Sequence, residues 1–285
     1  MLLERKSVMP PLWLAYPKSD RYSIGWRMGY GEEYKDRFFA WFETLMEEER
    51  QEYQELFPEP AVWKGWWEDR DTCELFSHGE YCIPFWRREG TPKYTLSGLR
   101  QEAAEGKRHE ICLFFRHQDS SDKSVTKSCF SQWEMGEFMA FDRVYCCMEQ
   151  FMMEQKAELF LDEEIRERIL GSRSPKEIKA LGKKVRGFQQ EVWDRVKYSI
   201  VLNGNWCKFS QNSAIRDFLL STGDAVLAEA SPYDAVWGIR LSENSPDARD
   251  PMKWRGQNLL GFALMEVRDE LRRVARNEGL CDWSA

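Results

Sequence analysis

Helical patterns follow one another through almost the whole second half of the sequence, and this succession restricts the fold more than any other feature. Apolar residues recur at helical spacing in six segments, at about residues 147–160, 163–170, 175–183, 188–203, 211–221 and 256–276. In the last segment, Leu260, Leu264 and Val267 belong to one apolar face. The patterns predict an α+β fold that is dominated by helices.

Strand candidates are few and short. The apolar run at 110–116 predicts one strand, and "AVLAEAS" and "VWGIRL" predict two more. Between them, "CFSQWEMGEFMAFDRVY" predicts short strands or turns. The helix that follows at 175 has a clear start, because Ser174 suits an N-cap, Pro175 the first helical position and Glu177 the first turn.

A polar stretch at about residues 100–108 predicts a boundary between two parts. Residues 1–107 form a small, mostly helical region that holds seven of the 13 tryptophans, and residues 108–285 form the larger domain. The aromatic density of the first part favours packing in a small core, while a platform for stacking bases or ligands is the alternative. Neither reading assigns this region a function.

The composition excludes several classes of protein. The N-terminus lacks the apolar core of a signal peptide and no run of about 18 apolar residues occurs, so we expect a cytoplasmic protein without membrane contact. Eight cysteines without a CxxC pair predict reduced core residues. A net charge of −7 argues against broad coating of nucleic acid and confines any such contact to one local site.

Histidine is scarce, and this limits the chemistry of the larger domain. His78, His109 and His117 are the only three, so no imidazole is available after residue 117 for a nucleophilic triad or an HExxH zinc site. The sequence has neither a Walker loop nor a GxGxxG motif after a strand. We therefore expect no metal and no cofactor, and chemistry carried by carboxylates, lysine, tyrosine or cysteine.

The segment "MEQFMMEQKAELF" places Glu149 and Lys156 on one face of a helix together with Met152. Seven residues turn a helix by about 700°, which puts the two charges about 10 Å apart along the axis. Burial raises the pKa of a carboxyl group and lowers that of an amine, which prepares an acid, a base or a nucleophile. A partly exposed helix with Glu149 near its N-terminus is the structural alternative.

Further polar residues interrupt apolar patterns farther along the chain. Lys176, Lys179 and Lys183 share a helix face, which suits either a phosphate or solvent. The remaining candidates share positions beside a helix end, a strand or a turn: Lys208 and Asn212 before one helix, Glu229 in a strand, Asp234, Trp237 and Gly238 in the turn "SPYDAVWG", and Trp254 and Asn258 before the last helix. The turn resembles a pocket rim, and Asn258 suits an N-cap.

Taken in order, these segments resemble the NADAR family, the YbiA-like group of N-glycosidases. The matching stretches are "CFSQW", "MEQFMMEQKAELFLD", "ILGSRSPKEIKALGKKVRGF", "WDRVKYSIV", "KFSQNSAIRDFLLSTGDAVLAEASPYDAVWGIRL" and "WRGQNLLGFALMEVRDEL". They cover about residues 108–285 and leave 1–107 uncovered. The resemblance implies hydrolysis of an N-glycosidic bond and a YbiA-like fold.

The resemblance also implies a set of site residues. Glu149 matches the catalytic glutamate of the family, and we expect Lys156 and Asp234 to act with it. The expected substrate-binding residues are Trp133, Met152, Lys183, Trp193, Lys208, Asn212, Glu229, Trp237, Gly238, Trp254 and Asn258. Two positions depart from the family pattern: Trp133 ends "SQW" where "SNF" is common, and Lys183 replaces the arginine of "LGR", which loses the bidentate fork.

Two substrates are known in the family, and both carry phosphate. We expect hydrolysis of the bond between ADP-ribose and guanine, with an ADP-ribose-containing ligand, ADP-ribosylated DNA contacted locally and an ADP-ribosyltransferase toxin as functional counterpart. Cleavage of phosphorylated riboflavin-biosynthesis intermediates is the alternative reaction. A non-catalytic ADP-ribose-binding module is the alternative of another class.

Overall fold

The computed structural model describes residues 8–68, 76–78, 81–85, 87–115 and 124–284. Helices dominate it, as the patterns predict, and His117 lies outside the described residues. The helices of the larger domain are α6 (Met148–Leu159), α7 (Glu163–Gly171), α8 (Pro175–Gly182), α9 (Gln190–Ser210), α10 (Ser213–Ser221) and α11 (Leu259–Val274). Ser174 caps α8 by accepting from the Glu177 N–H, with Pro175 at the first position, so the predicted helix start is confirmed.

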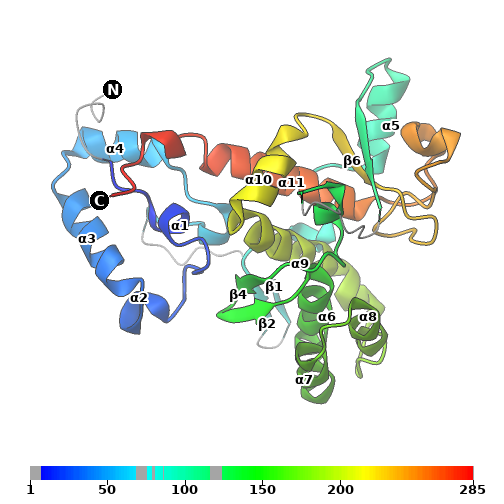
Figure 1. Ribbon diagram of the computed structural model, residues 1–285, viewed down its shortest axis with the longest axis horizontal. Coiled ribbons are helices and arrows are strands. Elements are labelled where there is room, and N and C mark those ends of the chain that lie inside the picture. Colours follow the sequence, from blue (N-terminus) through cyan, green and yellow to red (C-terminus); the bar gives the residue numbers. More distant parts are fainter. Residues whose placement is uncertain (1–7, 69–75, 79–80, 86, 116–123, 285) are drawn as a thin grey trace.

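The N-terminal part is built from short helices around a cluster of aromatic rings. It contains α1 (Leu12–Ala15), α2 (Gly25–Met28), α3 (Glu32–Glu43) and α4 (Glu47–Leu56), on the left in Figure 1. The ring centroids of Trp13 and Trp63 lie 5.5 Å apart, and those of Phe42 and Trp67 lie 5.6 Å apart in a stacked pair. These rings contact each other, so the packing interpretation of the tryptophans is confirmed for them.

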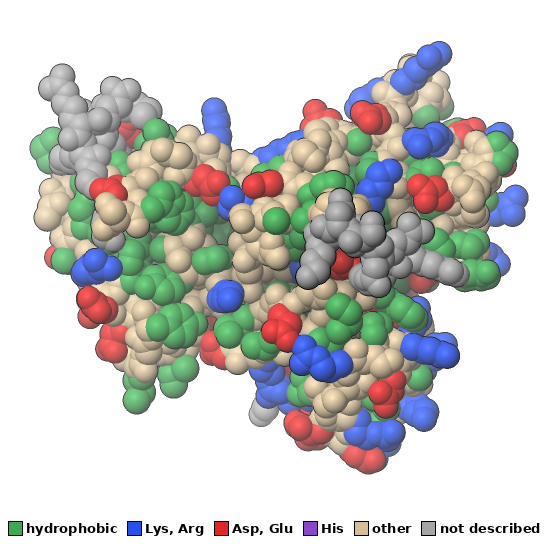
Figure 2. Space-filling view, in the orientation of Figure 1, with side chains coloured by type: hydrophobic (Ala, Val, Ile, Leu, Met, Phe, Trp, Pro, Cys, Tyr) green, Lys and Arg blue, Asp and Glu red, His purple; other side chains and the backbone are tan. Residues whose placement is uncertain are grey.

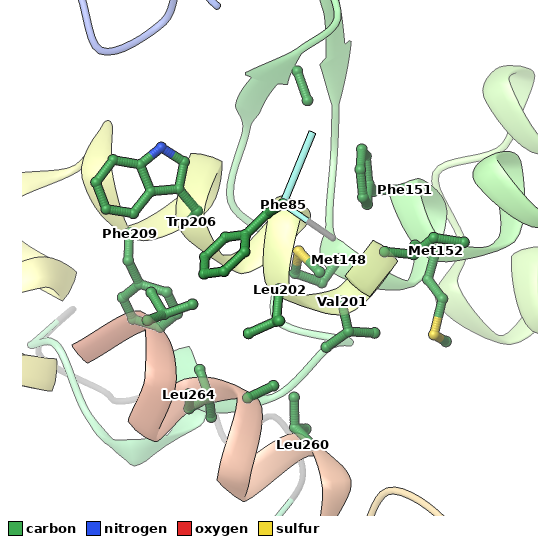
Figure 3. Packing of buried hydrophobic residues seen from close by; sticks show 14 of the residues in the cluster. Phe85, Met148, Phe151, Met152, Val201, Leu202, Trp206, Phe209, Leu260 and Leu264 are labelled. Atoms are coloured by element: carbon green, nitrogen blue, oxygen red, sulfur yellow. The ribbon is translucent and has the colours of Figure 1, made fainter. Parts of the chain in front are cut away.

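Helix α9 runs through the middle of the larger domain. Its Val201 and Leu202 lie between Met148 of α6 and Leu260 of α11, and all four side chains are buried (Figure 3). A Cβ atom on Gly204 would come within 2.6 Å of the Met148 side chain, so this glycine permits the close contact of α6 with α9. The central helix thus fixes the position of α6, the helix that carries Glu149.

Three two-stranded sheets accompany the helices. Strand β3 (Ile111–Phe114) pairs in parallel with β6 (Val226–Glu229), with Phe114 opposite Glu229. Strands β4 (Phe138–Ala140) and β5 (Arg143–Tyr145) form a hairpin, as do β1 (Phe76–His78) and β2 (Tyr81–Ile83). The predicted strands at 110–116 and 225–231 are confirmed as β3 and β6.

The strand predicted at 236–241 is wrong, because the chain forms a loop there. This loop makes single backbone hydrogen bonds to separate segments rather than a ladder along one strand. The Ile239 N–H donates to the Glu229 carbonyl at the end of β6 at 2.9 Å, and the Ile239 carbonyl accepts from Gly256 at 3.0 Å. Apolar residues that pack a compact loop can mimic the alternation of a strand. The consequence is a rigid loop directly beyond the end of β6.

The segment before β3 packs onto the helices of the larger domain. Helix α5 (Leu96–Ala104) contacts the 3₁₀ turn Pro251–Lys253. Glu266 of α11 is buried and accepts hydrogen bonds from the Arg87 guanidinium, the Lys93 N–H and the Tyr198 hydroxyl of α9. One buried carboxylate therefore joins the 87–93 segment to two central helices.

The two ends of the described chain meet at the N-terminal part. The Asp282 N–H donates to the Val8 carbonyl at 2.8 Å, which brings the segment after α11 back to the short helices (Figure 1).

In Figure 2 exposed hydrophobic side chains gather over the short N-terminal helices, whereas Lys and Arg side chains gather over the lobe formed by α6, α7 and α8. Within the described part of the chain, no helix combines the length and apolar character that a membrane crossing needs.

Candidate active site

A pocket of about 490 Å³ opens between the helical lobe and the end of β6. Its walls come from the 131–133 loop, α6, α8, the start of α9 and the turn that follows β6. Nine of the residues predicted from the sequence line it: Trp133, Glu149, Met152, Lys156, Lys183, Trp193, Glu229, Asp234 and Trp237. The structure thus brings together residues that are as much as 104 positions apart in the chain.

Glu149 projects into this pocket from the first turn of α6 and is only 2% exposed. Its backbone N–H donates to the Gln132 carbonyl at 2.8 Å, which joins the start of the helix to the 131–133 loop. Its Oε2 accepts from the Trp133 indole N–H at 3.2 Å, while its Oε1 is shielded and has no hydrogen-bond partner. One carboxylate oxygen is therefore held in place, and the other is left without a partner.

Burial raises the pKa of Glu149 to about 7, because the charged form loses its hydration. The positive charge of Lys179 and the Trp133 hydrogen bond oppose the rise, and the nearby charge of Asp234 adds to it. A carboxyl group with this pKa exchanges its proton near neutral pH, which is the requirement for a general acid or base.

Glu229 presents a second carboxyl group from the end of β6. Its Oε2 is shielded from solvent and has no hydrogen-bond partner. Burial raises its pKa to about 8, and the charges of Asp234 and Glu149 add to the rise while Lys179 opposes it. The two glutamates therefore interact across one pocket, although they belong to different elements.

The turn after β6 is organised by Asp234. Its Oδ1 accepts from the N–H groups of Val236 and Trp237 at 2.9 and 2.8 Å. A Cβ atom on Gly238 would lie 2.8 Å from the Glu229 carbonyl oxygen, so only glycine lets the loop pass this close to the strand. Asp234 and Trp237 are thereby fixed beside Glu229 in the pocket wall.

Lys156 follows Glu149 by seven residues on the same face of α6. Its Nζ donates to the Gly182 carbonyl at 2.9 Å and lies 4.0 Å from the centroid of the Phe188 ring and 5.6 Å from that of Trp193. Burial lowers the pKa of Lys156. The carbonyl and the two rings hold the amine in a fixed position at the edge of the pocket.

A basic rim faces the carboxylates. Lys179 of α8, Lys183 directly after α8 and Lys197 of α9 line the pocket. The Nζ of Lys179 lies 5.6 Å from the centroid of the Trp133 ring. Lys176 lies outside the wall. Lysines on the rim of a pocket suit a ligand that carries phosphate. Among the described residues, no group of three or more His, Cys, Asp and Glu side chains is arranged to hold a metal ion.

Two of the other predicted residues support the elements that carry the site. Lys208 is 4% exposed, and its Nζ donates to the Cys129 carbonyl at 2.6 Å and to the Ser131 carbonyl at 3.3 Å. Asn258 begins α11 with a φ of 57°, and instead of capping the helix its side chain accepts from the Glu229 N–H and donates to the Leu227 carbonyl. The predicted position of Asn258 is confirmed, and its predicted capping bond is wrong.

Three more predicted residues lie away from the pocket wall. Asn212 is exposed and caps α10, accepting from the Ala214 and Ile215 N–H groups. The Trp254 indole N–H donates to the Ala248 carbonyl at 2.8 Å in a buried position. Gly238 acts through the close approach of backbones described above. The sequence correctly marked these three residues as unusual. In the structure, each supports the backbone and none lines the first pocket.

The prediction missed other wall residues, namely Ser131, Gln132, Met153, Gly182, Phe188, Gln190, Lys197 and Val236. Lys179 belongs to the basic helix face that the sequence predicts to suit either a phosphate or solvent, and it lines the pocket. Phe188 follows a glycine in a polar segment, and no pattern in the sequence marks it.

A second pocket, of about 530 Å³, adjoins the first. Trp133, Lys179, Glu229 and Asp234 line both, and the second pocket extends to Tyr233 and the end of β3. Glu229 and Asp234 thus lie at the junction of two spaces, while Glu149 lines the first of them. A ligand with two bulky halves can be held with its middle at this junction.

The chain shares this site region with proteins of known family. A family model described as the NADAR domain matches residues 113–272. An N-glycosidase of Acanthamoeba polyphaga mimivirus is 40% identical over 163 residues, 55% of this chain and 95% of that protein, and an N-glycosidase of Nostoc punctiforme is 31% identical over 152 residues, 53% and 90%. The NMR structure of Escherichia coli YbiA covers 58% of this chain and 86% of its own, with 27% identity and a TM-score of 0.46. Because the family model spans more than half of the chain, the protein belongs to the NADAR domain family.

Proposed function

We propose that this protein is an N-glycosidase that hydrolyses the bond between ADP-ribose and guanine, and so opposes guanine modification by an ADP-ribosyltransferase toxin. The observation that carries the proposal is the position of Glu229 and Asp234 at the junction of two pockets, the first of which also holds the buried Glu149 and has lysines on its rim. ADP-ribosyl-guanine has a bulky phosphorylated half and a base half on either side of the bond. The two relatives named N-glycosidases support the reaction class.

The bond chemistry assigns roles to the carboxylates. An N-glycosidic bond breaks through a sugar with oxocarbenium character, so negative charge near the anomeric carbon lowers the barrier. Glu149 supplies that charge and activates water through its unpartnered Oε1. Asp234, whose Oδ1 is held by two N–H groups, uses Oδ2 for the ribose hydroxyl groups.

The aromatic and basic residues hold the rest of the substrate. Trp237 stacks on a base or flanks the sugar from the turn after β6, while Lys179 and Lys183 contact phosphate from α8. Lysine binds phosphate as a point charge, without the two parallel hydrogen bonds of arginine. Lys183 therefore provides attraction with less geometric selection than the arginine of the family pattern.

Lys156 supports a second route for the same reaction. Burial lowers its pKa, and a neutral amine can attack the anomeric carbon and form a Schiff base with the opened ribose. Borohydride added during turnover distinguishes the routes. A stable adduct on Lys156 supports the covalent route, and turnover without an adduct supports direct attack by water.

The function is tested with an oligonucleotide that carries ADP-ribose on guanine. Wild-type protein should release free ADP-ribose, Glu149→Gln should not, and Glu243→Gln, at an exposed position outside both pockets, should match the wild type. Cleavage of a phosphoribosylamino-pyrimidine in place of the oligonucleotide would transfer the proposal to riboflavin intermediates. Binding of ADP-ribose without any cleavage would identify a reader module.

A further inference from the structure

Glu229 has no part in the reaction as described so far, although it lies in the wall of both pockets. Its carboxyl group makes no ion pair or hydrogen bond within the described part of the chain, and its Oε2 is shielded from solvent. A shielded carboxyl oxygen without a partner costs free energy in the folded state. Packing and capping give no structural reason for it.

The backbone of Glu229 is held more firmly than that of a surface loop. Its N–H donates to Oδ1 of Asn258 at 3.1 Å, and its carbonyl accepts from Ser231 at 2.8 Å and from Ile239 at 2.9 Å. On the other side, β3 places Phe114 opposite it in the parallel pair. A group that must meet a reacting atom at a fixed distance needs this kind of support.

The charges around Glu229 favour a state in which one carboxyl group of the pocket keeps its proton. Glu149 of α6 and Asp234 of the turn contribute two further carboxyl groups, and Lys179 is the cation that acts on both glutamates. The other charged residues of the wall are Lys156, Lys183 and Lys197. Lys156 is engaged by Gly182 and two rings, and Lys197 forms an ion pair with Asp194. Three carboxylates cannot all ionise cheaply in a shielded space, so one of them keeps its proton.

We propose that Glu229 is the general acid of this site and protonates the nitrogen that leaves the anomeric carbon. The inference rests on the proposed N-glycosidase function and adds a second catalytic residue to it. The departing nitrogen of a base is a poor leaving group unless it gains a proton, so the site needs a donor as well as Glu149. Glu229 reaches the junction of the two pockets from β6, whereas Glu149 lines the first pocket from α6.

The proposed step is balanced. The bond between C1′ and nitrogen breaks, its electron pair goes to the nitrogen, and the proton of the Glu229 carboxyl group goes to the same atom. Water adds to C1′ and gives its proton to the Glu149 carboxylate, which leaves Glu229 ionised and Glu149 protonated until solvent restores both. If the Lys156 amine attacks instead of water, the leaving nitrogen still needs the proton of Glu229, so the role holds on either route.

The first test is the pH dependence of kcat on the ADP-ribosylated oligonucleotide. In the wild type we expect kcat to fall at alkaline pH as Glu229 loses its proton. Glu229→Gln should lower kcat by about 10²-fold or more and should abolish the alkaline fall. Glu229→Gln that retains most of the wild-type rate, or keeps the alkaline fall, would overturn the proposal.

The second test does not depend on activity. Infrared difference spectra between wild type and each Glu→Gln variant, recorded slightly above neutral pH, report which carboxyl group is protonated. The carboxylic acid band should disappear in Glu229→Gln and persist in Glu149→Gln. Its persistence in Glu229→Gln would show that Glu229 is ionised and exclude it as the acid. If the wild type leaves the oligonucleotide intact, the proposed function fails, while these spectra still decide the protonation of Glu229.

Discussion

The indole N–H of Trp133 donates a hydrogen bond to Oε2 of Glu149 at 3.2 Å. The bond stabilises the ionised carboxylate and lowers its pKa against the effect of burial. The 131–133 loop therefore helps to set the protonation of the glutamate at the start of α6.

Trp133→Phe should raise the pKa of Glu149, because the ionised form loses the hydrogen bond from the Trp133 indole. Activity that needs ionised Glu149 should then begin at higher pH, with the acidic limb of the kcat profile moving upward. Trp237→Phe is the matched control, since it changes an indole of the same pocket that makes no bond to Glu149. An acidic limb that stays in place in Trp133→Phe, or moves equally in both variants, would contradict this role.

Lys179→Gln should affect catalysis and binding together. The Lys179 charge lowers the pKa of both Glu149 and Glu229, so its loss should shift both limbs of the pH profile upward. It also removes a rim cation, so KM should rise by roughly tenfold or more, as expected for one charged hydrogen bond. Lys176→Gln, on the same helix but outside the pocket, should change neither the pH profile nor KM. A similar change in that variant would show that the effect of Lys179→Gln comes from the net charge of the protein.

Helical spacing predicted the part of the site that lies within single elements. Glu149 and Lys156 are seven residues apart and line one pocket because the helix that joins them exists as the pattern indicates. Lys179 and Lys183 likewise line one pocket at the spacing that predicts a shared face. A basic helix face that is exposed to solvent has the same spacing. The sequence shows which residues share a face, and it does not show which faces meet.

What the sequence could not predict depends on contacts between distant elements. Lys208 appears as a polar residue before a helix, but its ammonium is buried and bonds carbonyls 77 and 79 residues away. Asn258 has a left-handed backbone because the loop and β6 hold it there, whereas local propensity indicated a cap. The free oxygen of Glu229 is likewise a property of the assembled pocket.

Asn258→Ala should destabilise the protein more than Asn212→Ala. Asn258 is fully buried and satisfies a donor of Glu229 and an acceptor of Leu227, so its loss leaves two buried backbone groups unpaired, at about 2–4 kcal/mol. Asn212 caps α10 at the surface, and alanine there should cost about 1 kcal/mol. Denaturant titrations measure both values, and equal losses would show that the Asn258 bonds are weak.

Glu149→Gln should increase the stability of the protein relative to the wild type, and this increase should be larger at pH 8 than at pH 4. The folded-state pKa of Glu149, about 7, lies above its unfolded value, so the folded protein binds more protons and wild-type stability falls as pH rises from about 4.5 through 7. Glutamine removes this dependence, and the difference in unfolding free energy between variant and wild type should grow by about 3 kcal/mol between the two pH values. Exposed Glu243→Gln should show no such growth. A difference for Glu149→Gln that stays constant with pH would show that Glu149 ionises as readily in the folded chain as in the unfolded one, and would remove the physical basis for its role as a base.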